Sequence, residues 1–380
     1  MERTEFLVIG AGPYGLAAAA YAQSLGISVT IVGKTLDFWK SNMPPGMFLR
    51  SGRDWHLDAR QTATFEAYLS GRELTPAEAS PVPLDTFLDY AGWFMGQYGV
   101  IPRNAHVVHL MWSGGIYVAS LDDGSRLCAG KILLGLGFAC FKHYPDDLTR
   151  KLPPGSFTHT CDAVHFEQYR SKRVLIVGGR QSAFEWAALI REHGAEEVHV
   201  VYRHATPSFT GPDWSWVKPM VWRTLQDHAW WRKLGSGERE QIQKDFWMAG
   251  RLVLEEWLAA RVDQPNIHRH EKACIESAGA QADGTYEVKL SDNSRCNVHH
   301  VILATGYRPA MGNVGFLDRD TVLDRLATID GFPALDPEFQ TNLRGLYISG
   351  LAATRDFGPF FGFTVGCPVA ARIIGDAVMG

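Results

Sequence analysis

Three glycines near the start of the chain have the spacing of a phosphate-binding turn. Gly10, Gly12 and Gly15 follow the apolar run 6–9 and precede the alanine-rich stretch 16–22. The first glycine allows a tight turn, the second lets the main chain approach a pyrophosphate, and the third lets helix and strand pack closely. The helix N-terminus then attracts the anion. The motif predicts a bound dinucleotide, with a plain tight turn as the alternative.

The next strand of this unit lacks the carboxylate that usually binds the ribose hydroxyls of a dinucleotide. Its end reads Val32-Gly33-Lys34, with Asp37 three residues further on. We expect either Lys34 to contact the phosphates or the sugar, or Asp37 to take the place of the missing acid.

A second, altered copy of the glycine pattern follows the apolar run 173–177. It keeps Gly178, Gln181 and Ser182, but Arg180 stands where the second glycine belongs. The Arg180 side chain could obstruct a pyrophosphate or pair with it, and a purely structural relic is the alternative. The following strand ends at Arg203, and a cation there favours the extra phosphate of NADP over NAD. We therefore predict NADPH for this second unit.

Two further groups of side chains could act on a substrate. His56 with Asp58 could move protons, although a hydrogen-bonded loop histidine is the simpler interpretation. The tryptophan-rich segment 212–262 could wall a substrate channel through Trp214 and Trp216, or could form ordinary core. His268, His270, His299 and His300 have no carboxylate partner at the spacing of a metal site. We interpret them as solvated or structural, and we predict no metal site.

The elements that must position these residues can be read from hydrophobic periodicity. Each glycine pattern lies in a strand-turn-helix-strand unit, with strands at 6–9, 29–32, 173–177 and 197–201. Segment 85–98 has the pattern of an amphipathic helix, and 107–110 with 116–119 that of an antiparallel pair. The irregular segment 38–74 is expected to fold over a ligand. Strands at 286–290 and 301–306 are expected to form a last sheet that leads to 346–350, followed by a helix over 366–378.

Composition limits the class of protein. The chain has 380 residues, 46% of them hydrophobic, and a formal net charge of -4. This charge argues against a nucleic-acid binder, and no apolar run is long enough to span a bilayer. The six cysteines have neither a C-x-x-C pair nor metal-like spacing, so they suggest neither a disulfide framework nor a zinc site, and a reducing cytoplasm fits best. We predict a cytoplasmic protein without a membrane partner, and leave its oligomeric state open.

Both glycine patterns, taken with the string Ala304-Thr305-Gly306-Tyr307-Arg308-Pro309, resemble the flavoproteins with two dinucleotide-binding domains. More narrowly, the chain resembles the class B flavin monooxygenases, which include flavin-containing monooxygenases, Baeyer-Villiger monooxygenases and amine N-hydroxylases. The resemblance implies FAD in the first domain and NADPH in the second. It implies a monooxygenase that uses dioxygen to oxygenate a small organic substrate through a hydroperoxyflavin, because in such enzymes the cofactor carries the difficult chemistry.

The resemblance also assigns cofactor-binding residues by position. Those implied for FAD are Gly10, Gly12, Gly15, Lys34, Trp39, Arg50, Gly350, Phe361, Gly362 and Thr364. Those implied for NADPH are Gly178, Gln181, Ser182, Arg203, Thr305 and Gly306.

The sequence also departs from the pattern of that family. The F-x-G-x-x-x-H signature is reduced to Phe157-Thr158-His159-Thr160, and Ser51-Gly52 stands where many members have an asparagine near the flavin. Two alternative functions therefore stay open. One is an NADPH-dependent flavin oxidase or reductase without substrate oxygenation, and the other is a non-catalytic flavin-binding protein.

The predicted fold is α/β, with two Rossmann-like dinucleotide-binding domains, one for FAD and one for NADPH. Residues 1–165 form the first part of the FAD domain, and 300–380 the second part. Residues 166–299 form the NADPH domain, with a helical insertion at 212–262.

Overall fold

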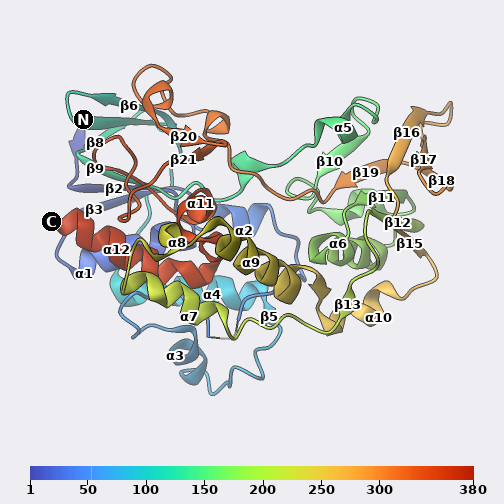
Figure 1. Ribbon diagram of the computed structural model, residues 1–380, viewed down its shortest axis with the longest axis horizontal. Helices are drawn as coiled ribbons and strands as arrows, with labels where there is room; N and C mark the ends of the chain where they lie inside the picture. Colours follow the sequence, from blue (N-terminus) through green and yellow to red (C-terminus); the bar gives the residue numbers. More distant parts are fainter. Residues whose placement is uncertain (53) are drawn as a thin grey trace.

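The computed structural model describes residues 1–52 and 54–380. Two lobes lie side by side (Figure 1), each built on a parallel sheet, and both chain ends lie on the first lobe. This confirms the predicted α/β class with two dinucleotide folds. No helix in the described part of the chain has the length and apolar character to cross a membrane.

The first lobe is built on a four-stranded parallel sheet in the order β22-β9-β2-β3. Its strands are β2 (Phe6–Ile9), β3 (Val29–Val32), β9 (Lys131–Leu134) and β22 (Leu346–Ile348). They are short apolar runs, as expected of parallel strands covered on both faces. The C-terminal strand β22 completes a sheet begun by residues 6–9, so both ends of the chain are needed to build this lobe.

One helix packs on this first sheet, and two further helices pack against that helix. They are α1 (Pro13–Ser24), α4 (Leu84–Tyr98) and α12 (Cys367–Met379). Helix α12 packs along α1, where the Gly375 position leaves room for the Tyr21 ring. The expected helices at 85–98 and 366–378 are confirmed to within a residue at each end.

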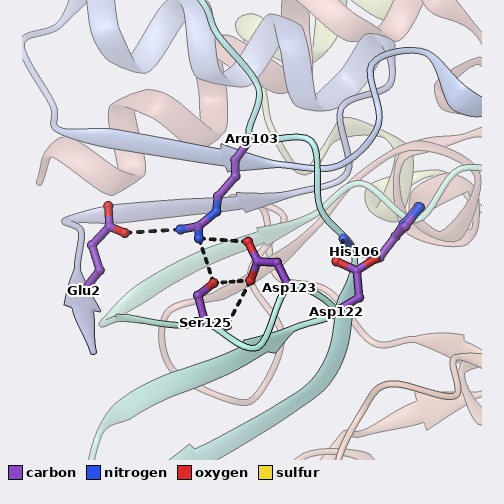
Figure 2. A network of polar contacts seen from close by, with 6 residues as sticks. All are labelled: Glu2, Arg103, His106, Asp122, Asp123 and Ser125. Carbon is purple, nitrogen blue, oxygen red and sulfur yellow. Dashed lines mark hydrogen bonds and ion pairs between the residues drawn. The ribbon is translucent and has the colours of Figure 1, made fainter.

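A second, mostly antiparallel sheet lies beside the first in the order β1-β8-β7-β6. It contains β1 (Glu2–Arg3), β6 (Val107–Ser113), β7 (Ile116–Leu121) and β8 (Arg126–Ala129). Figure 2 shows Arg103, in the loop that precedes β6, bound to two other parts of this sheet. It forms ion pairs with Glu2 on β1 at 3.2 Å and with Asp123 in the turn between β7 and β8 at 2.9 Å. These pairs are half exposed, so they fix the loop more than they stabilise the protein.

The second lobe contains a five-stranded parallel sheet in the order β10-β19-β11-β12-β15. Its strands are β10 (Phe157–His159), β11 (Arg173–Val177), β12 (Glu197–Tyr202), β15 (Ile267–Glu271) and β19 (His300–Leu303). Helix α6 (Gln181–Glu192) covers one face. The antiparallel sheet of β16 (Ile275–Ala280), β17 (Tyr286–Leu290) and β18 (Arg295–Val298) covers the other.

The expected last sheet is wrong. Strand β17 pairs with β16 and β18, whereas β19 joins the parallel sheet and β22 joins the first lobe. Apolar runs of similar length do not tell which sheet they enter, because pairing is decided by the tertiary fold. The second sheet also takes in strands at 157–159 and 300–303, which lie just outside the predicted NADPH domain of 166–299.

Segment 212–262 is helical, and its apolar side chains are divided between the cores of the two lobes: Leu258 and Val262 are buried in the core of the second lobe. Its helices are α7 (Val217–Trp222), α8 (Trp230–Lys233), α9 (Ser236–Phe246) and α10 (Ala259–Val262). Val217, Trp231 and Phe246 are buried in the first-lobe core, and the Trp231 indole N–H donates to the Arg355 carbonyl at 3.1 Å. The insertion therefore fastens the second lobe onto the first.

The remaining elements are short. The helices are α2 (Asp37–Ser41), α3 (Phe65–Ser70), α5 (Asp146–Thr149) and α11 (Thr354–Phe357). The strands form three small ribbons: β4 (Phe48–Leu49) with β5 (Val82–Pro83), β13 (Ser208–Phe209) with β14 (Val253–Leu254), and β20 (Thr328–Ile329) with β21 (Phe332–Pro333).

Candidate functional site

The first glycine turn lies between β2 and α1, and its three glycines have different steric surroundings. A Cβ on Gly10 would lie 2.3 Å from the Gly135 carbonyl oxygen, and one on Gly15 would lie 1.9 Å from the Gly10 carbonyl oxygen. Both glycines are therefore required by packing. A Cβ on Gly12 would meet no atom within 4 Å, so the space above this residue is open to a ligand.

Helix α1 begins at this open position without a cap. Gly12 provides no capping side chain, Pro13 stands at the first helical position, and the first turn has no acidic residue. The first N–H groups of a helix need a partner, and an anion is a favourable one. The turn has both the space and the electrostatics for a pyrophosphate.

The absence of the ribose-binding acid has a structural cause. Gly33 has φ +148°, and a Cβ there would lie 2.8 Å from the Ala11 main-chain nitrogen. The Gly33 N–H donates to the Arg103 carbonyl at 3.0 Å, which belongs to the loop held by the network in Figure 2. Only glycine fits at this position, because the end of β3 lies directly against the first turn. The next residue, Lys34, is exposed.

The second turn, between β11 and α6, repeats this arrangement with one change. A Cβ on Gly178 would lie 2.7 Å from the Ala304 carbonyl oxygen, and one on Gly179 would lie 2.5 Å from the Tyr202 Cβ. Arg180 occupies the N-cap of α6 in extended backbone conformation, as Gly12 does on α1. Its guanidinium lies 3.7 Å from the centroid of the Trp247 ring. The insertion thus holds the arginine beside the turn by a cation–π contact.

A large cleft opens at this second turn, with a cavity volume of about 1420 Å³. Both lobes and the insertion line it. The first lobe contributes Phe38, Asn42, Met43, Met47, Leu351 and Thr354, the second lobe Gly178, Arg180, Ser182 and Arg203, and the insertion Trp231, Arg239, Phe246 and Trp247. Its size and its position between two dinucleotide folds suit a cofactor together with a second molecule.

Five of the six residues predicted to bind NADPH line this cleft: Gly178, Ser182, Arg203, Thr305 and Gly306. Gln181 does not line it. Its side chain is buried, and its Oε1 accepts the Glu255 N–H at 3.2 Å. The Thr305 hydroxyl donates to the His143 carbonyl, and the His143 N–H donates to the Gly306 carbonyl at 3.0 Å. These bonds hold the segment around His143 against the segment that contains Thr305 and Gly306. The contacts of the six residues with NADPH stay predictions.

The residues predicted to border the flavin gather elsewhere, around Tyr14. The Tyr14 hydroxyl donates to the carbonyls of Phe361 and Phe363 at 2.6 and 2.9 Å, and Gly350 lies beside the Tyr14 ring. Gly362 lies in the same turn, and the Thr364 hydroxyl lies 3.5 Å from the Ser51 hydroxyl. None of Gly350, Phe361, Gly362 and Thr364 lines the large cleft, and their flavin contacts stay predictions.

Trp39 and Arg50 have structural partners that the sequence did not indicate. The Trp39 ring packs on Phe87 of α4, with centroids 4.4 Å apart. Arg50 forms an ion pair with Glu255 at 3.2 Å and donates to the Val253 carbonyl at 3.0 Å. Arg50 thereby connects the segment after β4 to the end of the insertion, and its place beside a flavin stays a prediction.

His56 and Asp58 organise a loop. The His56 Nδ1 accepts the Asp58 N–H at 3.1 Å, and its Nε2 lies 3.2 Å from the Gln61 Oε1. Burial lowers the pKa of His56 to about 4, and the Asp58 carboxylate accepts the N–H groups of Thr62 and Ala63. Neither side chain lines the cleft. The geometry favours the loop interpretation, and a catalytic role stays a prediction.

Trp214 and Trp216 lie in an aromatic cluster behind the cleft. Trp214 packs on Trp55 at 5.7 Å and on Phe246 at 5.5 Å, and Trp216 meets Phe246 edge-on at 6.3 Å. The buried indole N–H groups of Trp55 and Trp214 find no acceptor in the described part of the chain. Phe246, on which both Trp214 and Trp216 pack, lines the cleft, whereas the two tryptophans do not.

Three aromatic residues that sequence reasoning did not single out form a wall of the cleft. Phe38, Phe138 and Tyr307 pack with centroids 5.1 to 6.1 Å apart, and all three line the open space. Burial raises the pKa of Tyr307 far above its usual range, so this phenol stays protonated. The only signal in the sequence was the position of Tyr307 directly after Ala304-Thr305-Gly306.

Glu185, also missed by sequence reasoning, is buried on α6 between the lobes. Its Oε1 accepts the Phe48 N–H of the first lobe at 3.1 Å. Burial raises the pKa of this carboxyl from 4.5 to about 7, although Arg261 and Arg50 act in the opposite direction.

We expect Glu185→Gln to change the pH dependence of stability. In the folded protein the carboxyl keeps its proton up to about pH 7, whereas the unfolded chain loses it near pH 4.5. Stability from this group is complete below the unfolded pKa and is lost as pH rises through the folded one. The amide can still accept from Phe48 without becoming charged. Denaturant unfolding should show similar stabilities at about pH 4 and a variant more stable by about 1 to 3 kcal/mol at about pH 8. Equal pH profiles would contradict the prediction.

Comparisons with known proteins agree with this architecture. The sequence model of the family described as pyridine nucleotide-disulphide oxidoreductase matches residues 4–216. The chain is 30% identical over 129 residues to an FAD-dependent urate hydroxylase from Xanthomonas campestris, covering 33% of this chain and 27% of that protein. It is 28% identical over 201 residues to the rice (Oryza sativa) indole-3-pyruvate monooxygenase YUCCA1, covering 51% and 47%. The chain thus spans half or less of the length of these two curated relatives.

Among solved structures, the ornithine N-hydroxylase of Kutzneria sp. 744 superposes on nearly the whole molecule. It covers 99% of both chains with a TM-score of 0.78 at 15% sequence identity. Similarity at this identity concerns the fold. It confirms the two-domain architecture expected from the resemblance to class B flavin monooxygenases.

Proposed function

Because the chain belongs to the pyridine nucleotide-disulphide oxidoreductase family, we propose that it is an FAD- and NADPH-dependent monooxygenase that uses dioxygen to oxygenate a small organic substrate. One observation carries the proposal: two dinucleotide turns, each at an uncapped helix N-terminus, occur in one molecule, and the cleft at the second turn is lined by both lobes. The activities of the similar urate hydroxylase and indole-3-pyruvate monooxygenase support oxygenation.

The residues of the first turn fit FAD. The open space above Gly12 and the free N–H groups of α1 would receive the pyrophosphate, and Lys34 is exposed at the end of β3. When bound, the flavin supplies electron transfer from NADPH to dioxygen, which side chains alone cannot perform.

The second turn and its surroundings fit NADPH. The N-terminus of α6 would receive its pyrophosphate, and Arg203 at the end of β12 would bind the 2′-phosphate. Arg180, held on Trp247, adds positive charge beside the turn. These groups would hold the phosphates of NADPH at the second turn, on the cleft that both lobes line.

The aromatic wall would keep water from the reacting groups. Phe38, Phe138 and Tyr307 form a continuous apolar surface on the cleft. A dry site protects a reactive oxygen species from loss to solvent. Because burial keeps the Tyr307 phenol protonated, this residue lines the cleft without carrying charge.

The cysteines favour oxygenation over disulfide reduction. All six are free, and burial raises the pKa of Cys140 to about 11. A disulfide reductase needs a reactive thiolate, usually one of a pair. The free cysteines also support a location in the reducing cytoplasm.

Anaerobic and aerobic stopped-flow experiments test the function. NADPH should bleach the flavin without oxygen, and reoxidation by ¹⁸O-labelled dioxygen with a panel of amines and carbonyl compounds should place labelled oxygen in one product. If NADPH bleaches the flavin but all label appears in water or hydrogen peroxide, the protein is an oxidase or reductase. If the purified protein takes up no flavin, it is not a flavoenzyme.

A further inference from the structure

Three potential metal ligands from distant parts of the chain meet between the two sheets of the second lobe. His199 on β12, His270 on β15 and Cys296 on β18 each offer a ligand atom, and these atoms lie within 4.8 Å of one another. The sequence gives no sign of the group, because His270 is 71 residues from His199 and 26 from Cys296. The parallel pairing of β12 with β15 and the packing of β18 over them bring the ligands together.

Two of the distances within the group are close to those between the ligands of a tetrahedral metal ion. The His199 Nδ1 lies 3.1 Å from the His270 Nε2, which lies 3.7 Å from the Cys296 Sγ. Nitrogen and sulfur ligands of tetrahedral zinc are separated by about 3.3 to 3.6 Å, given their bond lengths to the metal. Cys296 is 3% exposed and the His199 side chain 12% exposed, so an ion here would be largely shielded from solvent.

The outer nitrogens of the two imidazoles face groups that would orient them toward an ion. The His199 Nε2 lies 3.4 Å from the Glu197 carboxylate, and the His270 Nδ1 lies 3.5 Å from the Ser294 hydroxyl. A metal-bound histidine usually donates its second N–H to a carboxylate or another oxygen, which fixes the ring and the tautomer. Both ligand histidines already have such a partner.

We propose that His199, His270 and Cys296 form a binding site for a divalent transition-metal ion, with Zn²⁺ the best match. Two nitrogens and one sulfur suit this borderline metal, and water would complete the tetrahedron. The three residues do not line the large cleft. The ion is therefore structural: it would join β18 of the covering sheet to β12 and β15 of the parallel sheet.

A neighbouring histidine defines the alternative. His268 stacks on His199 with ring centroids 4.7 Å apart, and with Glu197 and His199 it forms a second possible group. That set has no sulfur ligand. A sulfur-to-metal absorption band therefore distinguishes the two possible metal sites. If His199 and His270 are joined only by a hydrogen bond, the protein binds no metal at this place.

Cobalt binding to the untagged protein after treatment with a chelator tests the site. Co²⁺ should bind with one-to-one stoichiometry, giving tetrahedral d–d bands at wavelengths longer than oxidised flavin absorbs, and Zn²⁺ should displace it. Zn²⁺ should also raise the unfolding temperature. Cys296→Ser and His270→Gln should each weaken binding by more than about 100-fold, because each removes a ligand. Glu197→Gln, which alters only the partner of His199, should weaken it by about 10- to 100-fold.

Cys274→Ser is the matched control, because Cys274 is exposed near the same sheet. It should change affinity by less than about twofold, as should His268→Gln. Unfolding temperatures measured in the presence of chelator show whether each variant still folds. If a variant that lacks a ligand fails to fold, Glu197→Gln still tests the site. Absence of Co²⁺ uptake by the wild type would overturn the proposal. Unchanged Co²⁺ binding in Cys296→Ser, or loss of Co²⁺ binding in His268→Gln, would also overturn the proposal.

Discussion

Replacement of Gly12 with alanine should give a folded protein that has lost its flavin. The added Cβ meets no protein atom within 4 Å, and the residue is already in a conformation open to alanine. The apoprotein should lose no more than about 1 kcal/mol, the range for an altered helix N-cap. The methyl group would occupy the space proposed for the pyrophosphate. FAD affinity, measured by fluorescence titration, should fall by at least about 100-fold, or about 2.7 kcal/mol.

Gly15→Ala is the control that separates packing from ligand binding. Its Cβ would lie 1.9 Å from the Gly10 carbonyl oxygen, so helix α1 must move from strand β2. This variant should lose about 3 kcal/mol or more of stability with or without flavin. Full flavin content in Gly12→Ala would show that the pyrophosphate does not lie on this turn.

Arg203→Ala should change the choice of nicotinamide cofactor. Arg203 follows β12, is exposed, and lines the cleft at the second turn. Loss of its charged hydrogen bonds to a 2′-phosphate should raise the KM for NADPH by about 30- to 100-fold, which corresponds to about 2 to 2.7 kcal/mol. The KM for NADH should change by less than about twofold. Flavin reduction measured with each cofactor separates the two effects.

Lys172→Ala provides the control, because it removes the same charge from an exposed position outside the cleft. It should leave both KM values unchanged. An equal rise in KM for NADPH and NADH in Arg203→Ala would mean that Arg203 contacts a part shared by both cofactors. A wild-type preference for NADH would contradict the assignment of NADPH.

The two strand-turn-helix units could be predicted from the sequence because their signals are local. A tight turn requires glycine at Gly10 and Gly178, where φ is +110° and +147°. The apolar runs before each turn and after each helix are parallel strands. The predicted strands at 6–9, 29–32 and 173–177 coincide with β2, β3 and β11. The repetition of the unit and the resemblance to flavoproteins with two dinucleotide-binding domains indicated the fold class.

Features that depend on contacts between distant segments were not visible in the sequence. The glycine at Gly33 is explained only by its distance to Ala11 in the folded turn. The placement of Arg180 depends on Trp247, which the insertion delivers from 67 residues away. The insertion follows the second glycine turn in the chain, yet Trp231 and Phe246 pack into the core of the first lobe, whereas Leu258 packs into the core of the second.

By itself, then, the sequence determined the elements whose residues interact within one turn, helix or strand. These include both glycine turns, the strands beside them and the cation after β12. Only the tertiary structure decided which strands share a sheet, where the insertion docks, and which side chains line the cleft. It alone brought His199, His270 and Cys296 together. The physical reason is that periodicity and turn chemistry record local backbone preferences, whereas pairing and packing between distant segments depend on the folded chain as a whole.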